Sequence, residues 1–292
     1  MDIGRVGIWT FQLDGVPMAE SQRLAAEIED MGYGALWLPE AVGRDVLVNS
    51  GLILAATKRI VVGTGIANIW ARDAITMAAA HKTLTEAHPD RFLLGLGASH
   101  YHLVQHLRGH VYDKPYSYMS EYLDKMDAAP FMAAQPSTQP TRVLAALGPR
   151  MLKLAADKAM GAHPYFVPVE HTALARKTMG KGPILAVEQA IVLETDAEKA
   201  RKMARDHMAV YLRAPNYTNN LQRMGFADED FAEGGSDKLV DAIVAWGDTD
   251  AAKARVKAHH DAGADHVCIQ VVTEDPRRIA TSQWKALAKV LL

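Results

Sequence analysis

Short apolar and β-branched runs alternate with longer stretches of helical period along the whole chain. Runs without polar alternation indicate strands that are buried on both faces, as in a parallel sheet. Parallel neighbours need a crossover connection, which is usually a helix. Eight such units in 292 residues predict an α/β fold of the (β/α)8 TIM-barrel type rather than an open sheet. The predicted strands are Val6–Trp9, Ala35–Leu38, Ile60–Gly65, Phe92–Gly97, Arg142–Ala146, Gly161–Val167, Leu185–Leu193 and His266–Val272.

Helices are predicted between these runs. Met18–Met31 has apolar or small residues near helical spacing, and Asp45 and Asp73 stand directly before helix-like runs, where a carboxylate can cap free N–H groups. The longest connections follow the fourth and seventh predicted strands, so we expect insertions there, on the side of the barrel where loops build sites. Because no shift in composition marks a boundary, we expect residues 1–292 to form a single domain. Further predicted helices are Leu152–Met160, Ala197–Leu212, Ala251–Ala262 and Ile279–Leu291.

The composition narrows the class of protein. A formal net charge of −2, with 23% charged and 49% hydrophobic residues, gives no basic face for a nucleic acid. No apolar stretch approaches the roughly 18 consecutive residues of a membrane span, and the chain begins without a secretion-type leader. We therefore expect a cytoplasmic protein with a small-molecule substrate and neither a nucleic-acid nor a membrane partner. Cys268 is the single cysteine, so no internal disulfide is expected.

Polar residues follow several predicted strands at the end where barrel sites form. Glu40 comes after the second strand, Asn68 and Trp70 follow the third, and His100 follows the fourth. A carboxyl or imidazole in such a position can act as a general acid or base. Each of these residues alone is equally explained as a solvated loop group. The glycines at the same strand ends also relieve crowding without any ligand.

The segment after the fifth predicted strand is suited to an anion. Gly148 and Pro149 stand at the start of a predicted helix, where a proline is ordinary capping. The same helix start presents free N–H groups with a partial positive charge, which can hold a phosphate. The surrounding residues fit neither a P-loop nor a Rossmann fingerprint.

The twelve histidines do not predict a metal site. No HExxH motif or cluster of carboxylates accompanies them, so we expect no metal. No serine or cysteine stands in a nucleophile-elbow motif. His163 lies near a strand end beside aromatic residues, where it either faces a site or is an ordinary buried histidine. We group it with Trp9 and Trp70 as candidates to line an apolar substrate pocket.

Four segments, taken together and in order, resemble the bacterial luciferase-like superfamily, and within it the coenzyme F420-dependent oxidoreductases. The resemblance extends over most of the chain, and the region around residues 200–245 fits least well. It implies a TIM barrel that binds a flavin-type cofactor at the carboxyl ends of its strands. It also implies a homodimer, because relatives often form one. The segments are Gly32–Glu40, Val62–Asn68, Arg91–Gly97 and Leu144–Met151.

The resemblance implies roles for particular residues. Gly65 and Ile66 align with a bulge that often holds a non-prolyl cis peptide against the cofactor ring. Asn68 aligns with a polar residue that hydrogen-bonds the ring, and Glu40 aligns with an acidic or polar residue that faces it. The turn that grips the cofactor phosphate comprises Gly148, Pro149, Arg150 and Met151. Gly97 and Ala146, which lie in the matching segments, are assigned to the same cofactor site.

Two positions depart from the family's pattern. Several relatives have a catalytic histidine directly after the acidic position, where this chain has Ala41, and their glutamate near the end of the fourth strand is replaced by His100 or a neighbour. The sugar-phosphate dehydrogenase activity of those relatives is therefore not expected. The resemblance implies hydride transfer between coenzyme F420 and a small organic substrate, such as a carbonyl compound, an alcohol or an activated alkene. Glu40 or His100 would move the proton.

Two other functions stay open on the sequence. An FMN-dependent monooxygenase shares the fold, and its cofactor has the same phosphate and a similar ring. Arg150 beside the phosphate turn slightly favours F420, because its composite tail favours basic neighbours. A non-catalytic flavin-binding protein would bind cofactor without turnover. The candidate acids and the long connection after the seventh strand argue against this last function.

Overall fold

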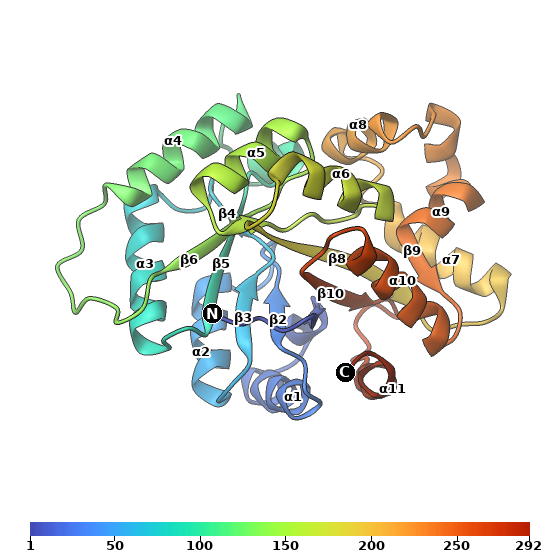
Figure 1. Cartoon of the computed structure of the whole chain (residues 1–292), viewed down its shortest axis with the longest axis horizontal. Coiled ribbons are helices and arrows are strands. Elements are labelled where there is room, and N and C mark those ends of the chain that lie inside the picture. Colours follow the sequence, from blue (N-terminus) through green and yellow to red (C-terminus); the bar gives the residue numbers. More distant parts are fainter.

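The computed structural model describes residues 1–292, and in it eight parallel strands close into a barrel with helices on the outside (Figure 1). This confirms the predicted (β/α)8 TIM barrel. Each barrel strand pairs in parallel with the next, and the last one pairs with both the seventh and the first, which closes the ring. The barrel strands are β1 (Val6–Trp9), β2 (Ala35–Leu38), β3 (Val61–Thr64), β5 (Phe92–Gly97), β6 (Thr141–Leu144), β7 (Gly161–Ala162), β8 (Ile184–Val192) and β10 (His266–Val271).

Helices cover the outside of the barrel. Asp45 and Asp73 cap α2 and α3 as predicted, because each carboxylate accepts hydrogen bonds from two backbone N–H groups in the first turn. Such a cap is worth about 1 kcal/mol of helix stability. The covering helices are α1 (Met18–Asp30), α2 (Val46–Ala56), α3 (Ala74–Ala87), α4 (Pro115–Asp127), α5 (Pro149–Lys158), α6 (Val169–Met179), α10 (Thr249–Asp261) and α11 (Thr281–Leu291).

Both predicted insertions are present. The connection after β5 holds a short π-helix, η2 (His102–Leu107), before α4. The connection after β8 is longer, and Figure 1 shows its elements grouped on one side of the barrel. They are α7 (Ala197–Met208), α8 (Pro215–Arg223), η3 (Asp228–Gly234), α9 (Asp237–Ile243) and β9 (Val244–Trp246). A further 3-10 turn, η1 (Gln12–Gly15), follows β1.

The predicted strand Gly161–Val167 is wrong beyond its second residue. Strand β7 ends at Ala162, since Pro164 has no N–H to donate to a ladder and Phe166 has a φ of 58°. Because β7 pairs only with the start of the long strand β8, the far part of β8 has a free edge. Strand β9 pairs there, with Val244 opposite Ala190. Neither β9 nor the two-residue strand β4 (Ala67–Asn68) was predicted from the sequence.

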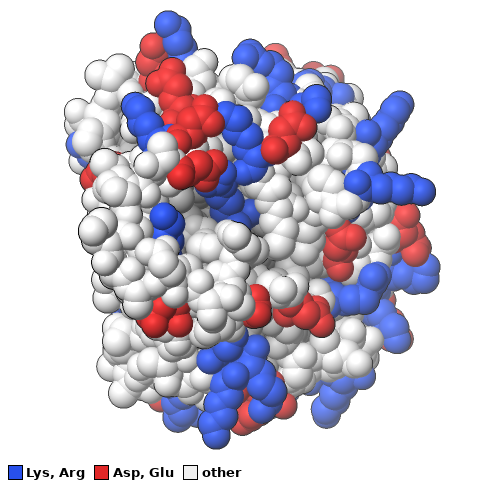
Figure 2. All heavy atoms as spheres, turned by 60° about the vertical axis from the view of Figure 1, so that its left-hand side comes forward, with Lys and Arg blue, Asp and Glu red and all other residues white.

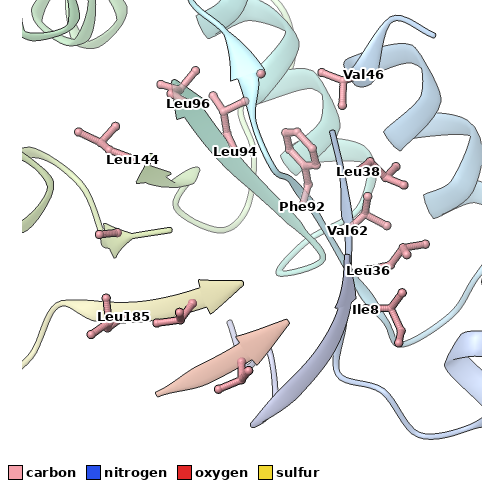
Figure 3. Packing of buried hydrophobic residues seen from close by; sticks show 14 of the residues in the cluster. Ile8, Leu36, Leu38, Val46, Val62, Phe92, Leu94, Leu96, Leu144 and Leu185 are labelled. Carbon is pink, nitrogen blue, oxygen red and sulfur yellow. The ribbon is translucent and has the colours of Figure 1, made fainter. Parts of the chain in front are cut away.

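Side chains alternate between the barrel interior and the helix layer, as strand geometry requires. Figure 3 shows part of the outward set, including Leu36 and Phe92, which packs against the helices in the main core. The inward set includes Trp37, which is fully buried. Gly63 leaves room for it, because a Cβ there would lie 2.8 Å from the Trp37 ring. His266 accepts a hydrogen bond from Trp37 Nε1 at 3.1 Å. These residues fill the barrel interior, so a binding site belongs at the ends of the strands.

The surface carries charges of both signs. Figure 2 shows lysine and arginine side chains interspersed with aspartate and glutamate on the face that it presents. Several of these charges form i,i+4 pairs within a helix, for example Lys153 with Asp157 on α5 and Lys257 with Asp261 on α10. None of the helices combines the length and the apolar character needed to cross a bilayer.

Candidate active site

A bulge directly after β3 forms the centre of the candidate site. The Gly65–Ile66 peptide bond is cis, as the family resemblance implied. Trp9 Nε1 donates a hydrogen bond to the Gly65 carbonyl at 3.1 Å. Glycine leaves room for close packing at two points around this bulge. A Cβ on Gly65 would lie 2.5 Å from Trp9 Nε1, and a Cβ on Gly97 would lie 2.4 Å from the Ile66 side chain. The two glycines therefore let the bulge pack against β1 and β5.

Glu40, which follows the neighbouring strand β2, supports the same bulge. Its carboxylate accepts a hydrogen bond from the Asn68 backbone N–H at 2.7 Å and two from the Arg72 guanidinium at 2.6 and 3.0 Å. The Glu40 side chain is only 5% exposed. Arg72 also contacts Asp45. Charge-assisted hydrogen bonds of this kind are strong, so they fix the Glu40 carboxylate against the bulge. Both of its oxygens are already occupied by protein donors.

Asn68 lies in β4 and is buried. Its side-chain oxygen accepts a hydrogen bond from the Trp70 N–H at 2.9 Å, whereas its side-chain NH2 group makes no hydrogen bond within the chain. Trp70 stacks on Tyr118, with 3.9 Å between the ring centroids, and donates to the Ala98 carbonyl. Trp70 thus packs towards α4, whereas Trp9 contacts the bulge itself.

The start of α5 presents unpaired backbone donors. Gly148 is the N-cap without a side-chain hydrogen bond, and Pro149 at the first helical position has no N–H. The N–H groups of Arg150 and Met151 precede the first intrahelical bond, which Leu152 N makes to the Gly148 carbonyl. Free donors of this kind, at the positive end of a helix, bind anions. Ala146, which precedes the turn, is buried.

Two arginines lie at this helix start. The Arg150 guanidinium stacks over the Tyr116 ring at 4.1 Å. Arg223, from α8 of the second insertion, reaches the other side, because its Nη2 lies 3.6 Å from the point where a Cβ on Gly148 would stand. Arg223 could not be predicted from the sequence, because nothing in the sequence shows that its side chain lies beside Gly148. The His171 imidazole fixes the turn through a 2.8 Å hydrogen bond with the Leu147 carbonyl.

His100 lies past the end of β5 and is partly buried. Its Nδ1 is 3.2 Å from Asn216 Oδ1, so Nδ1 carries the hydrogen and Nε2 presents a lone pair. Burial lowers the pKa of His100, which favours a neutral imidazole. The ring packs near Tyr217, with 5.3 Å between centroids. A neutral imidazole with a free nitrogen can accept a proton.

His163 is fully buried beneath the bulge. Its ring stacks on Trp37, with 4.4 Å between centroids. Its Nδ1 donates to the Ala186 carbonyl at 2.9 Å, and burial lowers the pKa of the imidazole to about 4. Its Nε2 has no partner and lies 3.1 Å from the point where a Cβ on Gly65 would stand. The structure thus brings His163 and Trp9 together at Gly65.

A polar network that the sequence did not reveal lies above the barrel interior. The Tyr165 hydroxyl is 2.6 Å from the Tyr211 hydroxyl and 2.8 Å from Gln270 Oε1. Glu188 on β8 is buried nearby, with one oxygen accepting from the Phe166 N–H and the other without a partner. Burial raises the pKa of Glu188 to about 8. A glutamate inside a predicted apolar strand was the one available signal for this network.

A cavity of about 580 Å³ opens beside this network, between the ends of β1 and β10 and helix α7. This volume is within the roughly 300–1,000 Å³ of typical small-molecule sites. Tyr211 and Gln270 form part of its wall, together with His207 on α7. None of the residues predicted for the cofactor site lines it, so the cavity and the bulge are neighbouring compartments.

The closed parallel barrel thus has a bulged third strand and a bare helix start at the carboxyl ends of its strands, where TIM-barrel enzymes form their active sites. The sequence profile of the luciferase-like monooxygenase family matches residues 5–266. The chain belongs to this family. A Mycobacterium tuberculosis protein assigned by name to the coenzyme F420-dependent oxidoreductases is 26% identical, over 92% of this chain and 93% of that protein.

Two solved structures share the fold. An F420-dependent secondary alcohol dehydrogenase in complex with an F420–acetone adduct superposes with a TM-score of 0.79 at 14% identity, covering 98% of this chain and 97% of that one. The oxygenating constituent of the 3,6-diketocamphane monooxygenase of Pseudomonas putida, in complex with FMN, gives a TM-score of 0.69 at 14% identity, covering 97% and 95%. The fold therefore accommodates enzymes of both cofactor types.

Proposed function

We propose that this protein is a coenzyme F420-dependent oxidoreductase that interconverts a small organic substrate, such as a carbonyl compound and its alcohol, or reduces an activated alkene. The observation that carries the proposal is the pairing of a glycine-lined bulge with a bare helix start flanked by two arginines. The F420-dependent relatives in sequence and in fold support it. When bound, the deazaflavin would supply hydride transfer.

The residues present fit such a cofactor. A Cβ at Gly65 or Gly97 would collide with Trp9 or Ile66, so these glycines keep the bulge in place as a support for one face of a planar ring. The unused NH2 group of Asn68 is suited to hydrogen-bond an oxygen or nitrogen on that ring. The free N–H groups of Arg150 and Met151 would hold the phosphate. Gly148 and Pro149 shape that turn, and Ala146 leads into it.

We infer that His100 rather than Glu40 moves the proton. Glu40 is bound by Arg72 and by the bulge backbone, so it acts as a positioning group that holds the bulge. His100 has a neutral imidazole with a free Nε2, which can take a proton from an alcohol or, once protonated, return it to a carbonyl oxygen. Trp9 would exclude water from the bulge, and His163 would support it from below.

A fluorescence titration of the purified apoprotein with F420, and separately with FMN, tests the cofactor. We expect F420 to bind more tightly than FMN. Arg150→Gln should weaken F420 binding about ten-fold through loss of one charge-assisted contact. Lys153→Gln, an exposed change one turn further along α5, is the matched control. A preference for FMN would place the protein with the oxygen-using monooxygenases, and binding of neither cofactor would refute the proposal.

A screen of alcohols, ketones and enones with bound F420 tests turnover. We expect the absorbance of the oxidised or reduced cofactor to change with at least one class. His100→Ala should lower the rate by roughly 10² or more while leaving F420 affinity unchanged. Tight binding without turnover in every class would identify a non-catalytic flavin-binding protein instead.

We also propose a homodimer formed through α2 and α3. Val48 and Leu52 lie one turn apart on α2 and are 63% and 41% exposed, and Ile75 in the first turn of α3 is 55% exposed. Burying such apolar side chains between two copies would be favourable. Light scattering on a sizing column should give a dimer for the wild type and a monomer for Leu52→Glu. Val210→Glu, an exposed position after α7, should leave the dimer intact.

A further inference from the structure

The cavity beside α7 separates charged from uncharged side chains. Its charged residues are all at the rim, on α7 or on the segments that follow β8 and β10. Lys202 is paired with Asp206 at 2.7 Å. Except for Glu194, which is partly buried, the charged side chains are exposed to solvent. The charged rim residues are Glu194, Lys199, Lys202, Asp206 and Glu274.

The inner wall is polar and uncharged. Thr10 and Gln270 are buried there. Burial lowers the pKa of His207 to about 4 and raises the pKa of Tyr211, so both side chains are neutral near pH 7. A charged ligand group that entered this part of the cavity would lose its hydration without meeting a counter-ion, which is costly. An uncharged ligand pays no such cost.

Three side chains on this wall have unused hydrogen-bonding capacity. His207 Nε2 is buried without a partner, which is unusual for a polar atom in a folded protein. The Gln270 amide uses its oxygen for Tyr165 and one N–H for Tyr211, so one N–H of its NH2 group is left over. Tyr165 has one hydroxyl hydrogen to share between Tyr211 and Gln270, so Tyr211 keeps capacity of its own. Hydroxyl and carbonyl groups would complete these three partners.

The same wall is one aromatic layer from the bulge. Phe11 at the cavity packs edge-on against Trp9, with 4.8 Å between ring centroids, and Tyr165 packs on the other side of Trp9 at 5.0 Å. Trp9 in turn donates to the Gly65 carbonyl. Tyr211 contacts Tyr165 directly. A small molecule in the cavity would therefore be separated from the proposed ring site by a single layer of side chains.

We propose that this cavity is a second binding site, beside the proposed ring site and not in contact with it, and that Tyr211, Gln270 and His207 make it selective for uncharged small molecules carrying a hydroxyl or carbonyl group. A ligand in this cavity would touch neither the bulge nor His100, so the proposal goes beyond the proposed function and does not depend on it. The preference for uncharged ligands rests on the cavity alone, and it is tested without cofactor.

Four ligands of one shape test the selectivity: cyclohexanol, cyclohexanone, cyclohexanecarboxylate and cyclohexylammonium. Their affinities for the apoprotein at pH 7 are measured by saturation-transfer NMR titration at millimolar concentrations. We expect the two neutral ligands to bind at least ten-fold more tightly than either ion. Tyr211→Phe and His207→Phe should each weaken the neutral ligands by roughly three- to ten-fold, as expected for one lost hydrogen bond.

Two further variants locate the binding. Met203→Trp fills the cavity from α7 and should abolish binding of the neutral ligands. Val210→Ala, an exposed neighbour of Tyr211, should have no effect. Equal binding of an ion, unchanged affinity in Met203→Trp, or binding by none of the four ligands would overturn the proposal.

An F420 titration of the same variants separates this proposal from the proposed function. If the neutral ligands bind as expected but F420 does not bind, the cofactor assignment fails and the selectivity of the cavity stands. If F420 binds and the neutral ligands do not, the cavity assignment fails and the cofactor assignment stands. An unchanged melting temperature shows that each variant is folded.

Discussion

Glu188 should make the stability of this protein fall as the pH rises through neutrality. Its side chain points into the barrel from β8, is 3% exposed, and has one carboxyl oxygen without a partner. Burial raises its pKa from 4.5 to about 8 in the folded protein. Between these two pH values the unfolded chain loses the proton and the folded chain keeps it. Unfolding then releases a proton, so each step up in pH favours the unfolded state.

The size of the change in the free energy of unfolding follows from the size of the pKa shift of Glu188. A difference in pKa is worth about 1.4 kcal/mol of differential stability per unit, so the full effect between pH 4.5 and 8 is on the order of 5 kcal/mol. Glu188→Gln removes the titration and keeps the shape and the acceptor for the Phe166 N–H. At pH 5 the variant and the wild type should have similar free energies of unfolding. At pH 8 the variant should be the more stable of the two by several kcal/mol.

Urea unfolding followed by tryptophan fluorescence at pH 5, 6, 7 and 8 measures this difference directly. The difference between variant and wild type isolates Glu188, because all other titrating groups are common to both. Glu121→Gln on α4, an exposed change of the same kind, should give a difference that stays constant with pH. A constant difference for Glu188→Gln as well would refute the reasoning, because it would mean that this carboxyl does not hold its proton in the folded barrel.

Three other substitutions test contacts in the site and the core. Arg72→Met should lower the free energy of unfolding in urea by about 3 kcal/mol, because it leaves the Glu40 carboxylate buried without its charged partner; adding Glu40→Gln should recover part of this loss. Trp37→Ala should cost about 3–5 kcal/mol in the same assay, because it empties the centre of the barrel interior. Gly97→Ala should weaken F420 binding in the fluorescence titration, because the new methyl group displaces Ile66; unchanged affinity would argue against the bulge as the ring support.

The fold could be predicted because its signal is local and repeated. Most barrel strands are buried along their whole length, so a largely apolar run marks them, and the caps Asp45 and Asp73 mark two helix starts. The prediction failed where a strand depends on its surroundings. Val244–Trp246 is too short to be recognised, and it is a strand only because β7 ends early and leaves an edge of β8 free.

The candidate site could be predicted only where it is built from strand ends. The sequence predicted Gly65, Asn68, Gly97 and the start of α5 as site residues, and the structure places them at the carboxyl ends of barrel strands. Tyr211 and Arg223 could not be predicted from the sequence, since their proximity to the strand ends depends on how the second insertion packs against the barrel. The ion pair of Glu40 with Arg72 likewise depends on side-chain geometry, so neither residue predicts it from the sequence.

The second insertion has a consequence for how this enzyme can diversify. The bulge and the start of α5 are part of the barrel's own connections, whereas His207 and Tyr211 belong to a segment that leaves the barrel after β8 and rejoins the sheet at β9. Mutations in the part of that segment before β9 leave the hydrogen-bonded ladders of the sheet intact. A chimera that exchanges residues 197–212, which hold α7 and Tyr211 but neither β9 nor Arg223, for those of a relative should therefore fold and change its ligand range while keeping its affinity for F420. In evolutionary terms, the proposed ring site and the proposed ligand cavity belong to parts of the chain that can change independently of each other.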